Sequence, residues 1–283
     1  MPTPAEAIEQ VLTFVGDILS ASSLRLGVGP TLIVLGVLLV FLQLVARPVT
    51  RWVTTDAAGL AGVGRSMAVA AEAGTDAVVT LGAAGLIRAT DAAGRLQTLA
   101  ALPILGHVVR AAARSGVAMR VLVNDPLAEV AARATLDAAH ESTSTRERVS
   151  RSRVVLVGEG RPVIAGLVMT TKARPAAAIA LGSLREEGML HLDGLRGTAG
   201  TLIAGTAESG QAAAPLLAEG GALVGPELLQ AAADLRADVN ERATVLAANR
   251  LIVAAVAVLV VGSVLSAVGI IVPIDLMLGL GRP

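Results

Sequence analysis

The residues best suited to bind a ligand stand directly after short apolar segments that we interpret as β-strands. They are glycines, hydroxyls, amides and acids: Gly82, Gly85, Asn124, Gly158, Glu159, Gly182, Glu187, Gly205, Thr206 and Glu227. In a parallel α/β sheet the carboxyl ends of the strands meet helix N-termini, whose free amides bind small anions. Several of these ligand-binding candidates could therefore cradle a small anionic molecule. The alternative is that the glycines only make tight turns.

Acidic side chains at the same strand ends suggest a second kind of chemistry. Glu159, Glu187, Glu208 and Glu227 could converge above the sheet and serve in proton transfer or in holding a divalent cation. Each acid alone is better explained as an early helical residue, where the helix dipole favours negative charge. The stretch VVLVGEGRPVIAG approaches a dinucleotide fingerprint, but it lacks the third glycine and the later acidic residue.

Other catalytic and metal-binding patterns are missing from the sequence. The chain has no cysteine, and its three histidines, His107, His140 and His191, form no metal-ligand spacing. Ser183 lacks the GxSxG elbow of a hydrolase, and there is no Walker motif. The 23 basic and 23 acidic residues balance, and aromatic residues are scarce, which argues against nucleic acid as a partner. We predict no catalytic residue, no metal and no cofactor.

Two long apolar segments predict a membrane protein. The chain is 54% apolar with a mean hydropathy of +0.70. Residues 24–46 are mostly apolar, and residues 251–272 carry no charge, so each could cross a hydrocarbon layer about 30 Å thick as a helix. The alternative is a pair of buried core helices, but such helices normally carry a polar stripe. The lipid bilayer is therefore an expected partner.

Charges beside these segments predict their orientation. Arginines flank the central part of the chain on both sides, at positions 47, 51, 65, 236, 242 and 250. Positive residues stay on the cytoplasmic side, so we expect a cytoplasmic central domain and both termini outside. The predicted parts are an external amphipathic segment (1–23), transmembrane helix 1 (24–46), a linker with a short helix (47–75), a cytoplasmic α/β domain (76–240), a helix continuing into transmembrane helix 2 (241–272) and an external tail (273–283).

Small residues recur on one face of each predicted span. They are Gly29 and Gly36 in the first span, and Ala255, Gly262, Ser266 and Gly269 in the second. Stacked small residues let membrane helices pack closely, so these are oligomer-packing candidates and we expect a homo-oligomer. Small residues are also common throughout this chain, and that simpler explanation stays open.

The central part alternates between short apolar runs and helical stretches. The predicted strands are 76–81, 119–123, 153–157, 177–181, 201–205 and 222–224; the predicted helices are 96–114, 126–140, 161–172, 184–196 and 211–218, and the polar run 141–152 is the longest loop. Strands that are apolar on both faces are covered by helices on both sides. This predicts an α/β fold with a mainly parallel, Rossmann-like sheet, helices on both faces and two flanking transmembrane helices.

A last helix is predicted to run unbroken from Pro226 to Val261, because that stretch contains no glycine and no further proline. It would join the domain rigidly to the second span. A weak heptad seam follows it, at Leu228, Ala232, Leu235, Val239, Arg242 and Leu246.

Most of residues 74–235 resemble an uncharacterised bacterial family, a domain of unknown function with a transmembrane helix at each end. The resemblance rests on GAAGLIRATDAAGRLQTLAALPILGHVVRAAARSG, NDPLAEVAARATLDAA and IAGTAESGQAAAPLLAEGGALVGPELLQAAA, within which QTLAALPIL, IAGTA and GPELL are distinctive. It implies two spans around an α/β domain in the bacterial inner (cytoplasmic) membrane, and no activity.

Two functions are compatible with these features. The first is a self-associating membrane scaffold or assembly protein whose cytoplasmic domain docks another membrane or cytoplasmic protein. The second is a membrane-tethered enzyme or sensor that binds a small anionic ligand at the glycine-rich strand ends. The missing catalytic motifs favour the scaffold.

Overall fold

The computed structural model describes residues 38, 40–42, 58–87, 92–143, 152–157, 174–184, 188–197 and 199–267. The chain divides into two compact units. One comprises Arg47–Val245 and is called the α/β unit below; the other, the terminal unit, comprises Met1–Ala46 with Leu246–Pro283.

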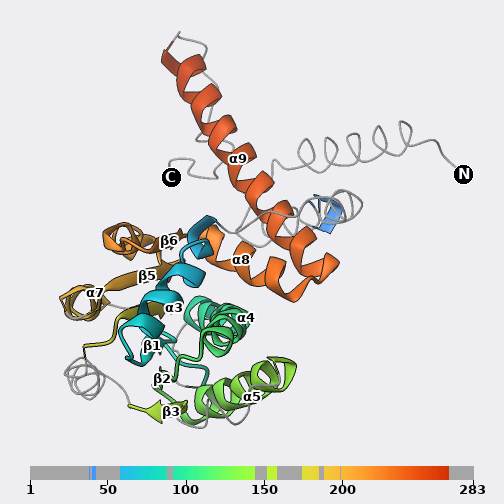
Figure 1. Ribbon diagram of the computed structural model, residues 1–283. Helices are drawn as coiled ribbons and strands as arrows, with labels where there is room; N and C mark the ends of the chain where they lie inside the picture. Colours follow the sequence, from blue (N-terminus) through green and yellow to red (C-terminus); the bar gives the residue numbers. More distant parts are fainter. Residues whose placement is uncertain are drawn as a thin grey trace, which may run out of the picture. The chain divides into compact units, whose positions relative to one another are not determined.

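Among the described residues of the α/β unit, six parallel strands form one sheet (Figure 1). They are β1 (Ala77–Thr80), β2 (Met119–Val123), β3 (Arg153–Leu156), β4 (Ala177–Leu181), β5 (Thr201–Thr206) and β6 (Gly221–Val224). Their order across the sheet is β3-β2-β1-β4-β5-β6, and each neighbouring pair runs parallel. The prediction of a parallel α/β sheet is confirmed, and the six strands lie where the apolar runs placed them.

Helices cover both faces of this sheet. On one face, α3 (Val63–Glu72), α4 (Ala92–Ser115), α5 (Pro126–Thr143) and α8 (Pro226–Arg236) pack with alternate strand residues such as Val79, Val121 and Ile179. On the other, α7 (Gly188–Arg196) and the 3-10 segment η3 (Ala214–Leu217) pack with the intervening residues, such as Val78 and Ala178. The described core is built from alanine and aliphatic side chains, which is why the near absence of aromatic residues does not prevent a packed interior.

Local sequence explains where the main helices begin. Pro126 and Pro226 are the first residues of α5 and α8, positions at which the missing N–H of proline costs nothing. Pro103 lies inside α4 without ending it, because 24 residues of helix are held by burial on the sheet. The 3-10 segment η1 (Ala58–Leu60) and the helix α3 precede β1.

Several predicted helices differ from the observed ones. The predicted helix 211–218 is wrong: this stretch contains the end of the 3-10 segment η2 (Ser209–Gln211) and then η3, because Pro215 cannot donate an i→i−4 hydrogen bond. Leu184 is not helical, and the helix expected at 184–196 is α7, from Gly188. The expected loop 141–152 begins later, since α5 extends to Thr143. The predicted helix 161–172 lies outside the described residues.

The predicted unbroken helix from Pro226 to Val261 is also wrong. α8 ends at Arg236, Ala237 adopts the left-handed conformation with φ +56°, and a new helix, α9 (Val239–Ala267), follows. Asp238 caps α9 by accepting hydrogen bonds from the amides of Asn240 at 2.7 Å and Glu241 at 3.4 Å. The weak heptad seam therefore does not run along one helix, because its residues up to Leu235 lie on α8 and those from Val239 lie on α9.

Of the first predicted span only Leu38 and residues 40–42 are described, whereas residues 251–267 of the second belong to helix α9. Within the part of the chain that the structure describes, one helix, α4, is long and apolar enough to cross a membrane, and two thirds of that stretch is buried, as in a core helix of a soluble domain. In the terminal unit, Leu38, residues 40–42 and Leu246–Ala267 are helical. Residues 252–256 of α9 are all exposed, and Ile252, Val253 and Val256 are large apolar side chains. The two flanking spans remain a prediction.

Candidate functional site

The strand order reverses between β1 and β4, which are neighbours at the centre of the sheet. From β1 the chain proceeds outward through β2 and β3, then returns to β4 and proceeds the other way through β5 and β6. In doubly wound sheets a ligand binds outside the carboxyl ends of the strands at this switch point. We call the residues gathered there the switch-point cluster: Gly82–Leu86, Gln97, Asn124, Asp125, Ser183, Thr206 and Glu208.

Two glycine turns meet at the switch point. Gly82 follows β1 with φ +77°, Gly182 follows β4 with φ +102°, and the amide of Ala83 donates to the carbonyl of Ser183 at 2.7 Å. A Cβ on Gly82 would lie 2.5 Å from that carbonyl oxygen. Glycine is therefore required at Gly82 for both its conformation and its close approach. The two loops close directly on each other.

Asp125 binds the loop that follows β1. Its carboxylate is fully buried and accepts hydrogen bonds from the backbone amides of Leu86 and, at 3.3 Å, Ile87. The other carboxylate oxygen accepts from the amide of Ala128 at 2.7 Å and so caps α5. Gly85 lies against this carboxylate with no room for a side chain. The amides expected to hold an external anion are thus held by a carboxylate of the chain itself.

The neighbouring polar side chains are also paired with one another. The amide of Asn124 donates to the carbonyl of Ala83, and Ser183 Oγ donates to Glu208 Oε2 at 2.8 Å. Gln97, near the start of α4, accepts from Thr206 Oγ1 at 3.2 Å and from the amide of Ala207 at 2.9 Å. Asn124, Asp125, Ser183, Thr206 and Gln97 are all buried, so these bonds offset the desolvation of their polar groups.

The remaining predicted ligand-binding residues are not members of this cluster or lie outside the described residues. Gly205, within β5, has Leu181, Leu223 and Leu228 side chains at 3.0–3.2 Å from where a Cβ would lie, so its role is close packing. Glu227 accepts a hydrogen bond from the amide of Val224 at 3.0 Å, at the start of α8. Gly158, Glu159 and Glu187 lie outside the described residues, so convergence of the four acids stays untested.

The oligomer-packing candidates are described only in part. Ala255 is exposed on α9, and Gly262 and Ser266 belong to the same helix. Gly29, Gly36 and Gly269 lie outside the described residues.

Sequence reasoning missed Gln97, although a lone amide among the apolar positions of α4 was a usable signal, because buried amides need partners.

Burial shifts the titration of three groups. It lowers the pKa of His140 below its ordinary 6.5, with an opposing effect from Asp137, and neither ring nitrogen of this buried histidine has a hydrogen-bond partner among the described residues. Burial, then Arg110 and Arg114, lower the pKa of His107. Burial raises the pKa of Asp234, with an opposing effect from Arg242.

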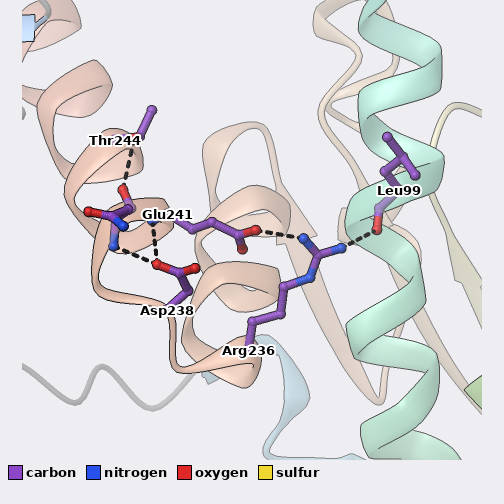
Figure 2. Close-up of polar contacts among 6 residues, drawn as sticks. Leu99, Arg236, Asp238, Glu241 and Thr244 are labelled. Carbon is purple, nitrogen blue, oxygen red and sulfur yellow. Dashed lines mark hydrogen bonds and ion pairs between the residues drawn. The ribbon is translucent and has the colours of Figure 1, made fainter.

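Two ion pairs hold the junction between α8 and α9, and Figure 2 shows the one between Arg236 and Glu241. Arg236 contacts Glu241 at 2.6 Å and, with its other terminal nitrogen, approaches the carbonyl of Leu99 on α4 at 3.5 Å. Arg242 reaches back to Asp234, with 3.1 Å between Nε and Oδ1, and donates to the Asp234 carbonyl at 2.8 Å. The first turn of α9 is thus bound to α8 on both sides of Ala237.

The described residues contain no group of three histidine or acidic side chains able to hold a metal ion. The chemistry of the switch-point cluster is that of hydrogen bonds between groups of the same chain. Together, the sheet order and its glycine turns define a doubly wound α/β protein of the Rossmann-like class.

Comparison with known proteins identifies the family. Residues 20–277 match the model of DUF6754, a domain of unknown function, and the chain belongs to that family. The match includes both predicted spans. No curated protein and no solved structure matches the chain.

Proposed function

We propose that this protein is a membrane-anchored scaffold whose α/β unit is a non-catalytic docking domain. The observation that carries the proposal is the internal pairing of the switch-point cluster. The Asp125 carboxylate holds the loop amides, and Ser183 is paired with Glu208. A site whose polar groups already satisfy one another is suited to shaping a rigid surface, because binding a ligand there would first have to break buried hydrogen bonds.

The membrane part of the proposal is supported by the exposed apolar stretch of α9. After Arg250 the described side chains, from Leu251 to Val256, are alanine or aliphatic, and those at 252–256 are exposed. An apolar helix surface of this kind is solvated by lipid at little cost and by water at a high one. We place the protein in the bacterial inner membrane, with two passes, a cytoplasmic α/β unit and both termini outside.

Self-association would use the small-residue faces of the two spans. Ala255, Gly262 and Ser266 recur at spacings of seven and four residues, which puts them on one face of α9. Copies of the chain packed through this face would present several docking domains side by side on the cytoplasmic surface.

Mass measurement of the full chain in mild detergent tests the scaffold. We expect an oligomer for the wild type and a shift toward monomer for Gly262→Leu, because a large side chain separates the helices. Val260→Leu, which by helical spacing lies off that face, is the matched control and should leave the mass unchanged. A wild-type particle that is monomeric at every concentration would contradict the proposal.

A second candidate function is a membrane-tethered sensor or enzyme that binds a small anionic ligand at the strand ends. It is favoured by the Rossmann-like strand order, because in doubly wound sheets a ligand binds at the switch point, which here lies between β1 and β4. A thermal-shift screen of nucleotides and of acyl or phosphorylated metabolites distinguishes the two functions. Stabilisation by one compound, lost in Ser183→Ala, supports the sensor; no shift from any compound supports the scaffold.

A further inference from the structure

The α/β unit has a groove of about 520 Å³ that shares no lining residue with the switch-point cluster. Its walls come from the middle and end of α4, the second half of α5 and the last residues of α8. The lining is mainly apolar, and it includes Leu102 and Pro103 from α4, Ala134 and Ala138 from α5, and Leu235 from α8. This volume is within the range of pockets that hold small molecules, roughly 300–1,000 Å³.

The groove contains two guanidinium groups in different states. Arg236 is paired with Glu241, so its charge is already balanced. Arg110 has no hydrogen-bond or ion-pair partner among the described residues, and its Nη1 lies 3.5 Å from where a Cβ on Gly106 would be, above another lining residue. Among the groups lining the groove, the Arg110 guanidinium therefore carries a positive charge with no described ion-pair partner, beside a mainly apolar lining.

The histidine beside this cation reports the same local charge. His107 lies on α4 one turn before Arg110, and burial lowers its pKa. Arg110 and Arg114 lower the pKa further, because their positive charges disfavour the imidazolium. An anion bound at Arg110 would reverse part of that effect.

We infer that this groove binds a small amphipathic monoanion, an aliphatic chain ending in a carboxylate, with the carboxylate paired to Arg110 and the chain along the α4–α5 floor. One free guanidinium matches one negative charge, and the planar pair forms two parallel hydrogen bonds. The apolar walls formed by Leu102, Ala134 and Ala138 supply the favourable burial of the chain. The site is independent of the membrane anchor and of the proposed scaffold function.

Octanoate, which is soluble as a monomer, is the probe, and octanol is its neutral control. Binding is measured by saturation-transfer NMR on the full chain in lipid nanodiscs. We expect saturable octanoate binding, weakened about tenfold or more in Arg110→Gln because a charge-assisted hydrogen bond is lost. Arg114→Gln, one turn further along α4 and outside the groove lining, is the matched control and should bind as the wild type does. Octanoate should also raise the pKa of His107, followed by its ring proton signals.

Two groove-filling variants separate this site from adventitious binding to lipid or detergent-like surfaces. Ala134 and Ala138 are exposed, so Ala134→Trp and Ala138→Trp fill the groove without entering the core, and each should abolish binding. Three results would overturn the inference: no saturable binding to the wild type, equal binding to the wild type and both tryptophan variants, or octanol binding as tightly as octanoate.

Discussion

The structural role of Asp125 gives the most specific prediction for the α/β unit. In Asp125→Ala, α5 loses its N-cap, which costs about 1 kcal/mol. The amide of half-buried Leu86 loses a charged acceptor, which costs about 2 kcal/mol, whereas the amide of exposed Ile87 can turn to water. The sum, about 3 kcal/mol, corresponds to a fall in Tm of roughly 6–12 °C for a domain of this size.

Circular dichroism of the full chain during heating in mild detergent measures this change. Glu129→Ala is the matched control, because Glu129 lies in the same first turn of α5 and, among the described residues, its carboxylate pairs with the exposed Arg133. A surface pair of this kind contributes at most about 1 kcal/mol. Hydrogen exchange at the Leu86 amide should accelerate in Asp125→Ala and stay unchanged in Glu129→Ala. If both variants lowered Tm by the same small amount, the clamp assigned to Asp125 would be refuted.

Three further predictions concern the rest of the described chain. Ala237→Gly should raise the free energy of unfolding by about 1 kcal/mol in thermal melts, since glycine adopts φ +56° without strain; no gain would mean that the turn is unstrained. Gly205→Ala should lower that free energy by about 1–3 kcal/mol by overpacking three leucines, and an unchanged Tm would contradict the close packing. Because burial lowers the folded-state pKa of His140, the unfolded chain binds the proton first, and stability should fall as pH drops below about 6.5. In thermal melts, the stability of His140→Leu should fall less than that of the wild type between about pH 7.5 and about pH 5.5. An equal fall in both proteins would exclude His140 as the cause of the pH dependence.

Much of the sheet could be predicted from sequence because its strands are buried on both faces. Runs such as 119–123 and 177–181 are short, apolar and bounded by glycine or polar residues, and they are strands over those same residues. The order of the strands could not be predicted in this way. The order depends on the connection after β3, which places β4 beside β1. Packing between segments far apart in the chain decides that placement.

A local feature of the sequence marks the break between α8 and α9. Asp238 followed by Glu241 has the spacing of a capping box, which marks a helix start. The structure shows the first half of this box, in which Asp238 Oδ1 accepts hydrogen bonds from the amides of Asn240 at 2.7 Å and Glu241 at 3.4 Å. The lack of glycine and of a further proline after Pro226 suggested one continuous helix. Alanine can nevertheless occupy a left-handed position, as Ala237 does, when capping and ion pairs offset its strain.

Several of the predicted site residues lie at the carboxyl ends of the strands, but the hydrogen bonds between them could not be predicted from the sequence. Glycine and acidic residues after strands are compatible with an anion site and with structural turns. The hydrogen bond from Leu86 to Asp125 joins residues 39 positions apart, and that from Thr206 to Gln97 joins residues 109 apart. Only the folded sheet brings these groups together.

The most direct test of the proposed membrane anchorage is fractionation of lysed cells that produce the full chain, without detergent. Ultracentrifugation should leave the protein in the membrane pellet, and it should stay there after washing with alkaline carbonate, which removes peripheral proteins. Recovery of the chain in the aqueous supernatant would show that its two apolar segments are covered by protein and would contradict the membrane scaffold.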